Sequence, residues 1–134
     1  MLVLVVFVLF LCSCNPKHAD PSSHRPIDIP KAIASKLQCL QRGIASWYGT
    51  HMNGHLTASG EKYNSKALTA ASRKFSLGTK LNVINLQNNR NVLVTVNDRG
   101  PYFGERIIDM SVAAAEALDM KEAGLVPVCV QKIE

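Results

Sequence analysis

The sequence predicts a mainly β protein, a small closed barrel of short strands with one or two short helices. Two observations carry this prediction. Apolar residues alternate with other residues in several short runs, of which Val92, Val94 and Val96 form the clearest. Turn signals rich in glycine, asparagine and proline separate the runs, and a closed barrel is the architecture that leaves such strands without exposed edges.

The strands are expected where this alternation is found: residues 43–48, 68–71, 80–85, 92–96 and 126–130. Residues 50–60, with glycine, asparagine and two histidines, are expected to form a loop, and Gln87–Arg90 should turn a hairpin. Ser111 is a favourable N-cap for a helix over 112–118, which is rich in helix formers. In so small a core only the largest hydrophobic side chains should matter individually: Trp47, Leu81, Val94, Ile107 and Leu118.

Length and charge limit the function. A chain of 134 residues holds one domain, and its formal charge of +5 suits an anionic polymer. The basic residues are scattered, so the sequence shows no stripe for nucleic acid. It also shows no metal-ligand cluster, phosphate-binding loop or nucleophile elbow, and we expect neither a metal nor another cofactor.

The N-terminal region has the pattern of a bacterial lipoprotein. Residues 1–13 are an apolar run ending in Leu11-Cys12-Ser13, too short to span a bilayer and typical of a signal peptide, although no basic residue precedes the run. Cys14 would then be lipidated, and Asn15 after it resembles the pattern that sorts lipoproteins to the outer membrane. Residues 14–38, rich in proline and serine, would tether the lipid to a domain over 39–134. The alternative is a buried N-terminal strand or helix.

A turn with two opposite charges ends the strand over 92–96. Asn97-Asp98-Arg99-Gly100-Pro101 places a carboxylate and a guanidinium at the end of a rigid element, which suits a reactive centre. The other interpretation is an ordinary turn, in which Asp98 bonds its own backbone and Arg99 faces water.

Five motifs in the same order decide between these interpretations. They are GIASWYG at 43–49, TASGE at 57–61, LTAA at 68–71, NDRGP at 97–101 and RIIDMS at 106–111. Together they resemble the rare lipoprotein A family, bacterial cell-wall lytic transglycosylases with a double-psi β-barrel. The resemblance implies a six-stranded barrel of that kind from Gly43 onward.

The resemblance also implies a function. The expected activity is cleavage of peptidoglycan glycan strands with 1,6-anhydro products, by a protein at the periplasmic face of the outer membrane that has division-site proteins as possible partners. Asp98 would be the general acid and base, since one carboxyl with a raised pKa can serve both steps. Glu61 matches a second functional acid, although it also suits a solvated loop. The implied substrate-binding residues are Tyr48, Thr69, Ser72, Asn97 and Arg99.

Two positions depart from the family pattern. Where the family usually has Glu-x-Tyr-Asp, this chain has Glu61-Lys62-Tyr63-Asn64, and the second departure is the more serious. Where the family has Leu-Thr-Ala-Ala-His, this chain ends the motif with Ser72, which donates a hydrogen bond but carries no charge. His51 or His55 in the neighbouring loop are candidates to replace the missing group. The departure leaves a peptidoglycan-binding module without turnover as the alternative function, and a hydrolase of another β-1,4 glycan as a third.

Two cysteines remain for a disulfide once Cys12 is cleaved off and Cys14 is lipidated. Cys39 precedes the first strand and Cys129 lies in the last, and these two strands should pair to close the barrel. We therefore predict a disulfide between Cys39 and Cys129. Two free thiols are the alternative.

Overall fold

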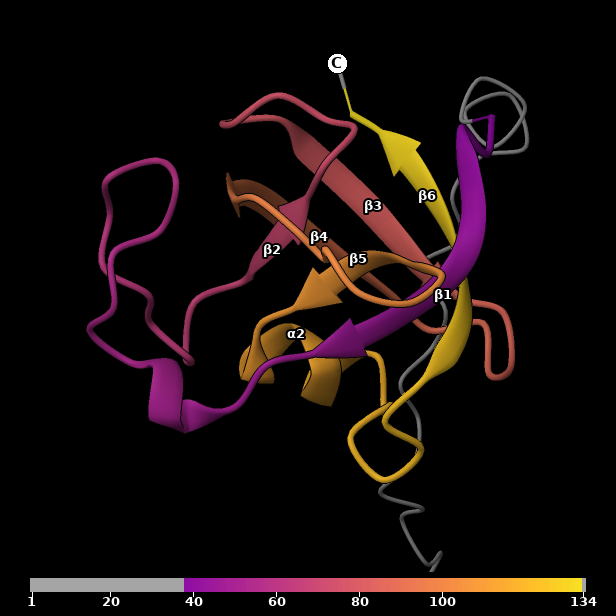
Figure 1. Ribbon diagram of the computed structural model, residues 1–134. Coiled ribbons are helices and arrows are strands. Elements are labelled where there is room, and N and C mark those ends of the chain that lie inside the picture. Colours follow the sequence, from indigo (N-terminus) through magenta and orange to yellow (C-terminus); the bar gives the residue numbers. More distant parts are fainter. Residues whose placement is uncertain (1–37, 134) are drawn as a thin grey trace, which may run out of the picture.

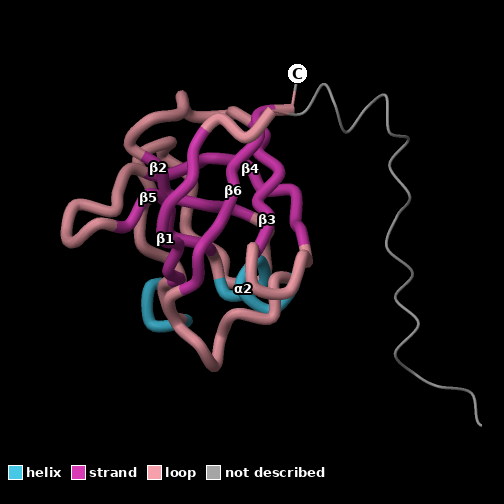
Figure 2. The backbone as a smooth tube through the Cα atoms, turned by 90° about the vertical axis from the view of Figure 1, so that its right-hand side faces the viewer, coloured by secondary structure: helices cyan, strands magenta, loops and turns pink. Residues whose placement is uncertain are grey.

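The structure confirms the mainly β barrel. The computed structural model describes residues 38–133, and its six strands close in the order β1-β5-β2-β4-β3-β6 (Figures 1 and 2). The strands are β1 (Gln41–Trp47), β2 (Thr69–Ser72), β3 (Lys80–Asn85), β4 (Asn91–Asp98), β5 (Arg106–Met110) and β6 (Val126–Lys132). The helices are the 3-10 turn η1 (Thr50–Met52) and α2 (Val112–Ala117). The predicted signal segment, Cys14 and nearly all of the predicted tether lie outside the described residues.

Parallel and antiparallel pairs together close this barrel. The pairs β1–β5 and β2–β4 are parallel, and the other four are antiparallel. The first and last strands pair over Gln41–Val130 to Ala45–Val126, as predicted, so the described chain begins and ends at one seam. Because every strand has two neighbours, none of the six presents a free edge.

The alternation in the sequence sorts side chains to the two faces of the barrel wall. In β4, Val92, Val94 and Val96 are buried, whereas Leu93 between them is 57 % exposed. Three of the five expected core side chains, Leu81, Val94 and Leu118, are buried in the main hydrophobic cluster. The other two, Trp47 and Ile107, are only partly buried and pack against that cluster from its margin.

The predicted helix forms with the predicted cap. The Ser111 hydroxyl accepts a hydrogen bond from the backbone N–H of Ala114 at 3.3 Å, and α2 follows directly. The helix ends at Ala117, one residue earlier than expected, because Leu118 turns into the core as the C-cap. Helix α2 lies at the lower end of the barrel in Figures 1 and 2. Within residues 38–133 no helix is long and apolar enough to cross a membrane.

A disulfide joins Cys39 to Cys129 in the structure. Their α-carbons are 5.7 Å apart, within the usual range for a bridge, and the two residues are separated by 90 positions. The bond ties the segment before β1 to β6, next to the pair Arg42–Cys129. It therefore closes almost the entire domain into one covalent loop.

We predict that Cys39→Ser lowers the free energy of unfolding by about 2–5 kcal/mol, because opening so long a loop restores entropy to the unfolded chain. Urea unfolding of the full chain under oxidising conditions measures the change. Wild-type protein in reductant is the control and should unfold at the same urea concentration as the variant. Equal stability of oxidised wild type and variant would contradict the prediction.

Candidate active site

Strand pairing brings two carboxylates to opposite sides of one small residue. In β2, Ala71 pairs with Asp98 of β4 on one side and with Asp109 of β5 on the other. The register of β2 against β4 shifts between Ala70 and Ala71, and this irregularity sets Asp98 opposite Ala71. The charges of Asp98 and Asp109 both act on Tyr48, so the two carboxylates belong to one site. We call Asp98, Ala71 and Asp109 the carboxylate row. Ser46 of β1 pairs with Asp109 and extends the row by one strand.

The predicted loop over 50–60 holds Asp98 in place. The backbone N–H groups of Ala58 and Arg99 both donate to Asp98 Oδ1, at 2.9 and 2.8 Å. The N–H of Ser59 donates to the Asn97 carbonyl at 3.0 Å. The Asn97 amide donates in turn to Glu61 Oε2 at 3.4 Å. The structure thus brings together three of the site residues expected from the sequence: Asp98, Asn97 and Glu61. Both hydrogen bonds to the Asp98 carboxylate end on the same oxygen, Oδ1.

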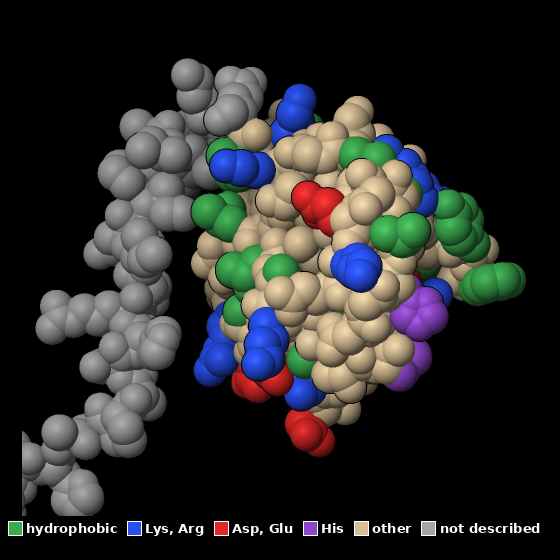
Figure 3. Space-filling model, turned by 90° about the vertical axis from the view of Figure 1, so that its left-hand side faces the viewer, with side chains coloured by type: hydrophobic (Ala, Val, Ile, Leu, Met, Phe, Trp, Pro, Cys, Tyr) green, Lys and Arg blue, Asp and Glu red, His purple; other side chains and the backbone are tan. Residues whose placement is uncertain are grey.

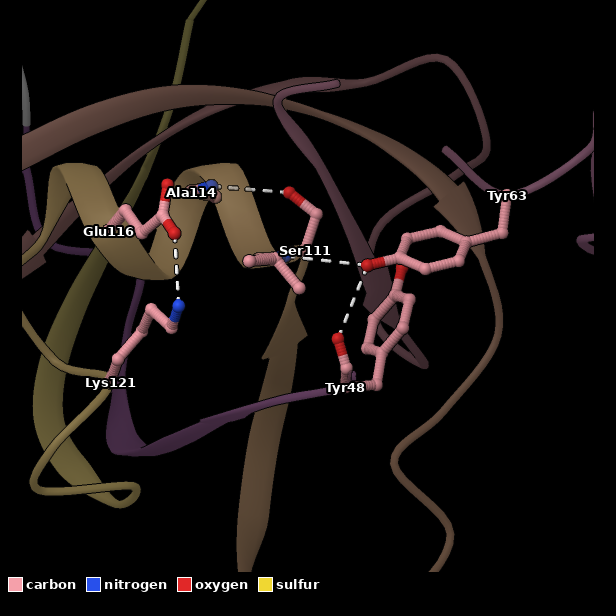
Figure 4. Close-up of polar contacts among 7 residues, drawn as sticks. Tyr48, Tyr63, Ser111, Ala114, Glu116 and Lys121 are labelled. Atoms are coloured by element: carbon pink, nitrogen blue, oxygen red, sulfur yellow. Dashed lines mark hydrogen bonds and ion pairs between the residues drawn. The ribbon is translucent and has the colours of Figure 1, made fainter. Parts of the chain in front are cut away.

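Tyr48 and Tyr63 close one end of the site. Their ring centroids are 4.6 Å apart, and the Tyr63 hydroxyl donates to the Tyr48 carbonyl at 3.2 Å. The N–H of Val112, the first residue of α2, donates to the same Tyr63 hydroxyl at 3.4 Å (Figure 4). Tyr63 therefore ties the 49–68 segment, which projects from the barrel in Figure 1, to both β1 and the helix.

The buried hydroxyl of Tyr48 lies near enough to both carboxylates for their charges to act on it. Burial is the main cause of its raised pKa, and the charges of Tyr63, Asp98 and Asp109 raise the pKa further, whereas Thr69 lowers it. The Thr69 hydroxyl lies close enough to interact with the Tyr48 hydroxyl, but neither of these buried groups has a partner with full hydrogen-bond geometry. The Tyr48 hydroxyl thus stays protonated and has a hydrogen bond to give.

Asp109 is partly buried, with 15 % of its side chain exposed. Burial raises the pKa of Asp109, and the Arg106 guanidinium opposes this effect. Arg106 Nη1 lies 3.3 Å from Asp109 Oδ1, an ion pair without hydrogen-bond geometry, since that oxygen has no hydrogen-bond partner. Asp109 therefore holds a proton more readily than a free aspartic acid.

Two other expected site residues have structural partners. Arg99 Nη1 donates to the carbonyls of Ser72 and Phe75, at 2.8 and 2.9 Å, so its guanidinium holds backbone and does not neutralise Asp98. The buried Ser72 hydroxyl accepts from the N–H groups of Lys74 and Phe75, at 3.2 and 3.3 Å. Both side chains shape the turn that follows β2.

The histidines of the 49–68 segment are exposed. His51 and His55 lie at the surface. Figure 3 shows histidine side chains, in purple, at one edge of that view of the molecule. Within the described part of the chain, no group of three or more histidine, cysteine, aspartate or glutamate side chains is arranged to hold a metal ion.

Sequence reasoning missed Asp109 and Tyr63 as members of the site. Asp109 is part of the motif at 106–111, and its signal was a carboxylate within the otherwise apolar run Ile107-Ile108-Asp109-Met110. A charge in such a strand, next to a helix N-cap, indicates a carboxyl held for chemistry. Tyr63 had no comparable signal, because its contacts depend on how the 49–68 segment folds back onto Tyr48.

Curated bacterial proteins resemble the barrel in sequence. The chain is 52 % identical over 91 residues to the endolytic peptidoglycan transglycosylase RlpA of Campylobacter jejuni, a match that covers 68 % of this chain and 33 % of that protein. It is 46 % identical over 92 residues to the probable endolytic peptidoglycan transglycosylase RlpA of Synechocystis sp., with 69 % and 29 % covered. The chain thus spans about a third of the length of the curated relatives it matches.

Solved structures share the fold at low identity. The Streptomyces papain inhibitor matches with a TM-score of 0.57 and 19 % identity, over 73 % of this chain and 99 % of that one. A variant expansin of Clavibacter michiganensis, solved in complex with cellohexaose, matches with a TM-score of 0.56 and 20 % identity, over 69 % of this chain and 50 % of that one. Residues 40–130 match the family described as "Lytic transglycolase". Since that match covers most of the chain, the chain belongs to the lytic transglycolase family, and its closed barrel is the double-psi barrel of the RlpA proteins.

Proposed function

We propose that this barrel cleaves the glycan strands of peptidoglycan as a lytic transglycosylase, at the bond between N-acetylmuramic acid and N-acetylglucosamine. The observation that carries the proposal is the placement of Asp98 and Asp109 on either side of Ala71. Neighbouring strands lie about 4.8 Å apart, so the two α-carbons are separated by roughly 10 Å. One carboxyl group can thus donate a proton and the other accept one at the same bound sugar.

The reaction needs a proton donor, a proton acceptor and no water. The acid protonates the glycosidic oxygen, and the bond from C1 of N-acetylmuramic acid to that oxygen breaks. The C6 hydroxyl of the same sugar attacks the oxocarbenium-like C1 and loses its proton to a carboxylate. The products are a 1,6-anhydro end and a free hydroxyl on the departing N-acetylglucosamine.

We assign the two proton transfers to the two carboxyl groups. Asp109 suits the acid, because burial raises its pKa. Asp98 suits the base, because two backbone N–H groups fix one of its oxygens and its side chain is partly exposed. After turnover the proton returns from Asp98 to Asp109 through solvent. The sequence alone assigned both steps to Asp98, and the raised pKa of Asp109 is what supports dividing them.

The residues around the carboxylate row supply hydrogen bonds to the substrate. Tyr48 and Thr69 offer buried hydroxyls without partners, and Asn97 Oδ1 is a third buried atom that lacks one. These groups suit the hydroxyl and acetamido substituents of a sugar. Glu61, held by the Asn97 amide, is placed to stabilise positive charge at C1.

A peptidoglycan-binding module without turnover is the second candidate function. Its supporting observation is Ser72, which stands where the family pattern has histidine and whose hydroxyl bonds the following turn. In the proposed mechanism no step passes through position 72, so the substitution is compatible with activity. Product formation separates the two candidates.

The N-terminal motif gives the proposal a location. We propose that Cys14 carries the lipid that anchors the protein at the periplasmic face of the outer membrane, with residues 14–38 as the tether. Division-site proteins are the possible partners there. The support is the lipobox pattern around Leu11-Cys12-Ser13-Cys14, which lies outside the described residues.

We predict that the purified protein releases fragments with 1,6-anhydro ends from peptide-free glycan strands, and that Asp98→Asn abolishes release. Asparagine keeps the shape of the side chain but accepts no proton. Mass spectrometry of the products is the measurement. Asp119→Asn is the matched control: Asp119 is 68 % exposed and pairs only with Arg90 at 3.9 Å, so activity should be unchanged. Reducing ends would indicate a hydrolase, and binding without product would indicate the inactive module.

We predict that Tyr48→Phe lowers kcat by roughly 100-fold, the usual cost of removing one donor at a reacting centre. The free energy of unfolding should change by less than about 1 kcal/mol, because the lost hydroxyl has no hydrogen-bond partner. Tyr63→Phe provides the comparison. It removes a hydroxyl with two backbone partners and should cost about 1–2 kcal/mol of stability with a smaller effect on kcat. Full activity of Tyr48→Phe would exclude the hydroxyl from the reaction.

A further inference from the structure

Two adjacent aromatic side chains stand exposed beside the carboxylate row. Tyr102 is 66 % exposed and Phe103 is 81 % exposed, the highest value among the large hydrophobic side chains of the described residues. They lie in residues 99–105, the loop that joins β4, with Asp98, to β5, with Asp109. In Figure 3, hydrophobic side chains project at the same edge of the molecule as the histidines.

The backbone that carries these rings is anchored at both ends. At the start of the loop, Arg99 bonds the turn after β2, and the next two residues, Gly100 and Pro101, are buried. At the other end, Arg106 Nε donates to the Phe103 carbonyl at 3.3 Å. The same guanidinium pairs with Asp109. The rings are therefore presented to solvent by a fixed segment that is connected to both carboxylates.

Contacts at Gly100 place Tyr102 next to the carboxylate row. A Cβ at Gly100 would lie 3.9 Å from two atoms of the Tyr102 ring and 4.0 Å from the Cβ of Ala71. Ala71 is the residue that separates Asp98 from Asp109. Gly100 also has φ +134°, a conformation that other residues rarely adopt. The backbone at this position therefore favours glycine, which leaves the Tyr102 ring and Ala71 close to each other.

We propose that Tyr102 and Phe103 form an aromatic subsite that stacks on the sugar rings of the glycan strand next to the bond being cleaved. Pyranose rings present faces of C–H groups, and exposed aromatic rings gain from covering such faces. The inference rests on the proposed function and adds the residues that hold the strand across the row. A membrane contact has less support: Arg99 and Arg106 are engaged by backbone carbonyls and by Asp109, so the exposed Glu105 leaves the loop without a free basic group for an anionic lipid surface.

Binding of a defined oligosaccharide tests the subsite. The probe is a peptide-free hexasaccharide of alternating N-acetylglucosamine and N-acetylmuramic acid, titrated calorimetrically into the full-length Asp98→Asn protein, which should bind without cleaving. Adding Tyr102→Ala or Phe103→Ala should weaken Kd by about 5- to 10-fold each. Phe103→Trp, which keeps an aromatic ring, should bind the hexasaccharide at least as tightly as the Asp98→Asn parent. Leu93→Ala is the matched control, since Leu93 is 57 % exposed on β4, five residues before Asp98, and should leave Kd unchanged.

The outcomes separate the subsite from the function on which it rests. If wild-type protein yields 1,6-anhydro ends and both alanine variants bind the hexasaccharide like their parent, the subsite is overturned and the proposed function stands. If the parent does not bind and wild type yields no product, both fail. Loss of binding to phosphatidylethanolamine–phosphatidylglycerol vesicles with unchanged hexasaccharide binding would make the loop a membrane contact and also overturn the subsite.

Discussion

The position of β2 between β4 and β5 is the constraint on which the rest of the site depends. A parallel pair on one side and an antiparallel pair on the other bring Asp98 and Asp109 to the same residue, Ala71. A side chain larger than alanine would occupy the space between the carboxyl groups. The 49–68 segment and the 99–105 loop then pack around this row, and their contacts fix the carboxylate of Asp98 and the rings of Tyr102 and Phe103.

Burial raises the pKa of Asp109, as the proposed acid requires, and costs the fold stability. Because the pKa of Asp109 is raised in the folded protein, the folded state holds its proton at pH values where the unfolded chain has lost it. The free energy of unfolding therefore falls as the pH rises from the ordinary carboxyl pKa toward that of folded Asp109. Arg106 limits this loss, whereas burial of the Tyr48 and Thr69 hydroxyls without full hydrogen-bond geometry costs further stability.

Local pattern predicted the helix cap and five of the six strands but not β5, because period-two alternation and Ser111 act over a few residues. The pairing of the first and last strands followed from the need to close the barrel. Ordered motifs led to Asp98 and Glu61, which the structure places at one site. The partners of Arg99 and the role of Asp109 could not be predicted in this way. They depend on register between strands distant in sequence, and one shifted pair would turn Asp109 away from Ala71.

The claim that Asp109 is the carboxyl that holds the proton is tested most directly by its own titration. NMR of the side-chain carboxyl carbon, with Asp109→Asn to assign the signal, measures the pKa in the folded wild-type protein. We expect Asp109 to titrate above the ordinary aspartate pKa of about 3.9, and we expect Arg106→Gln to raise the pKa of Asp109 further. A pKa at or below that ordinary value would contradict the account, because Asp109 would then be ionised throughout the working range and unable to donate the proton.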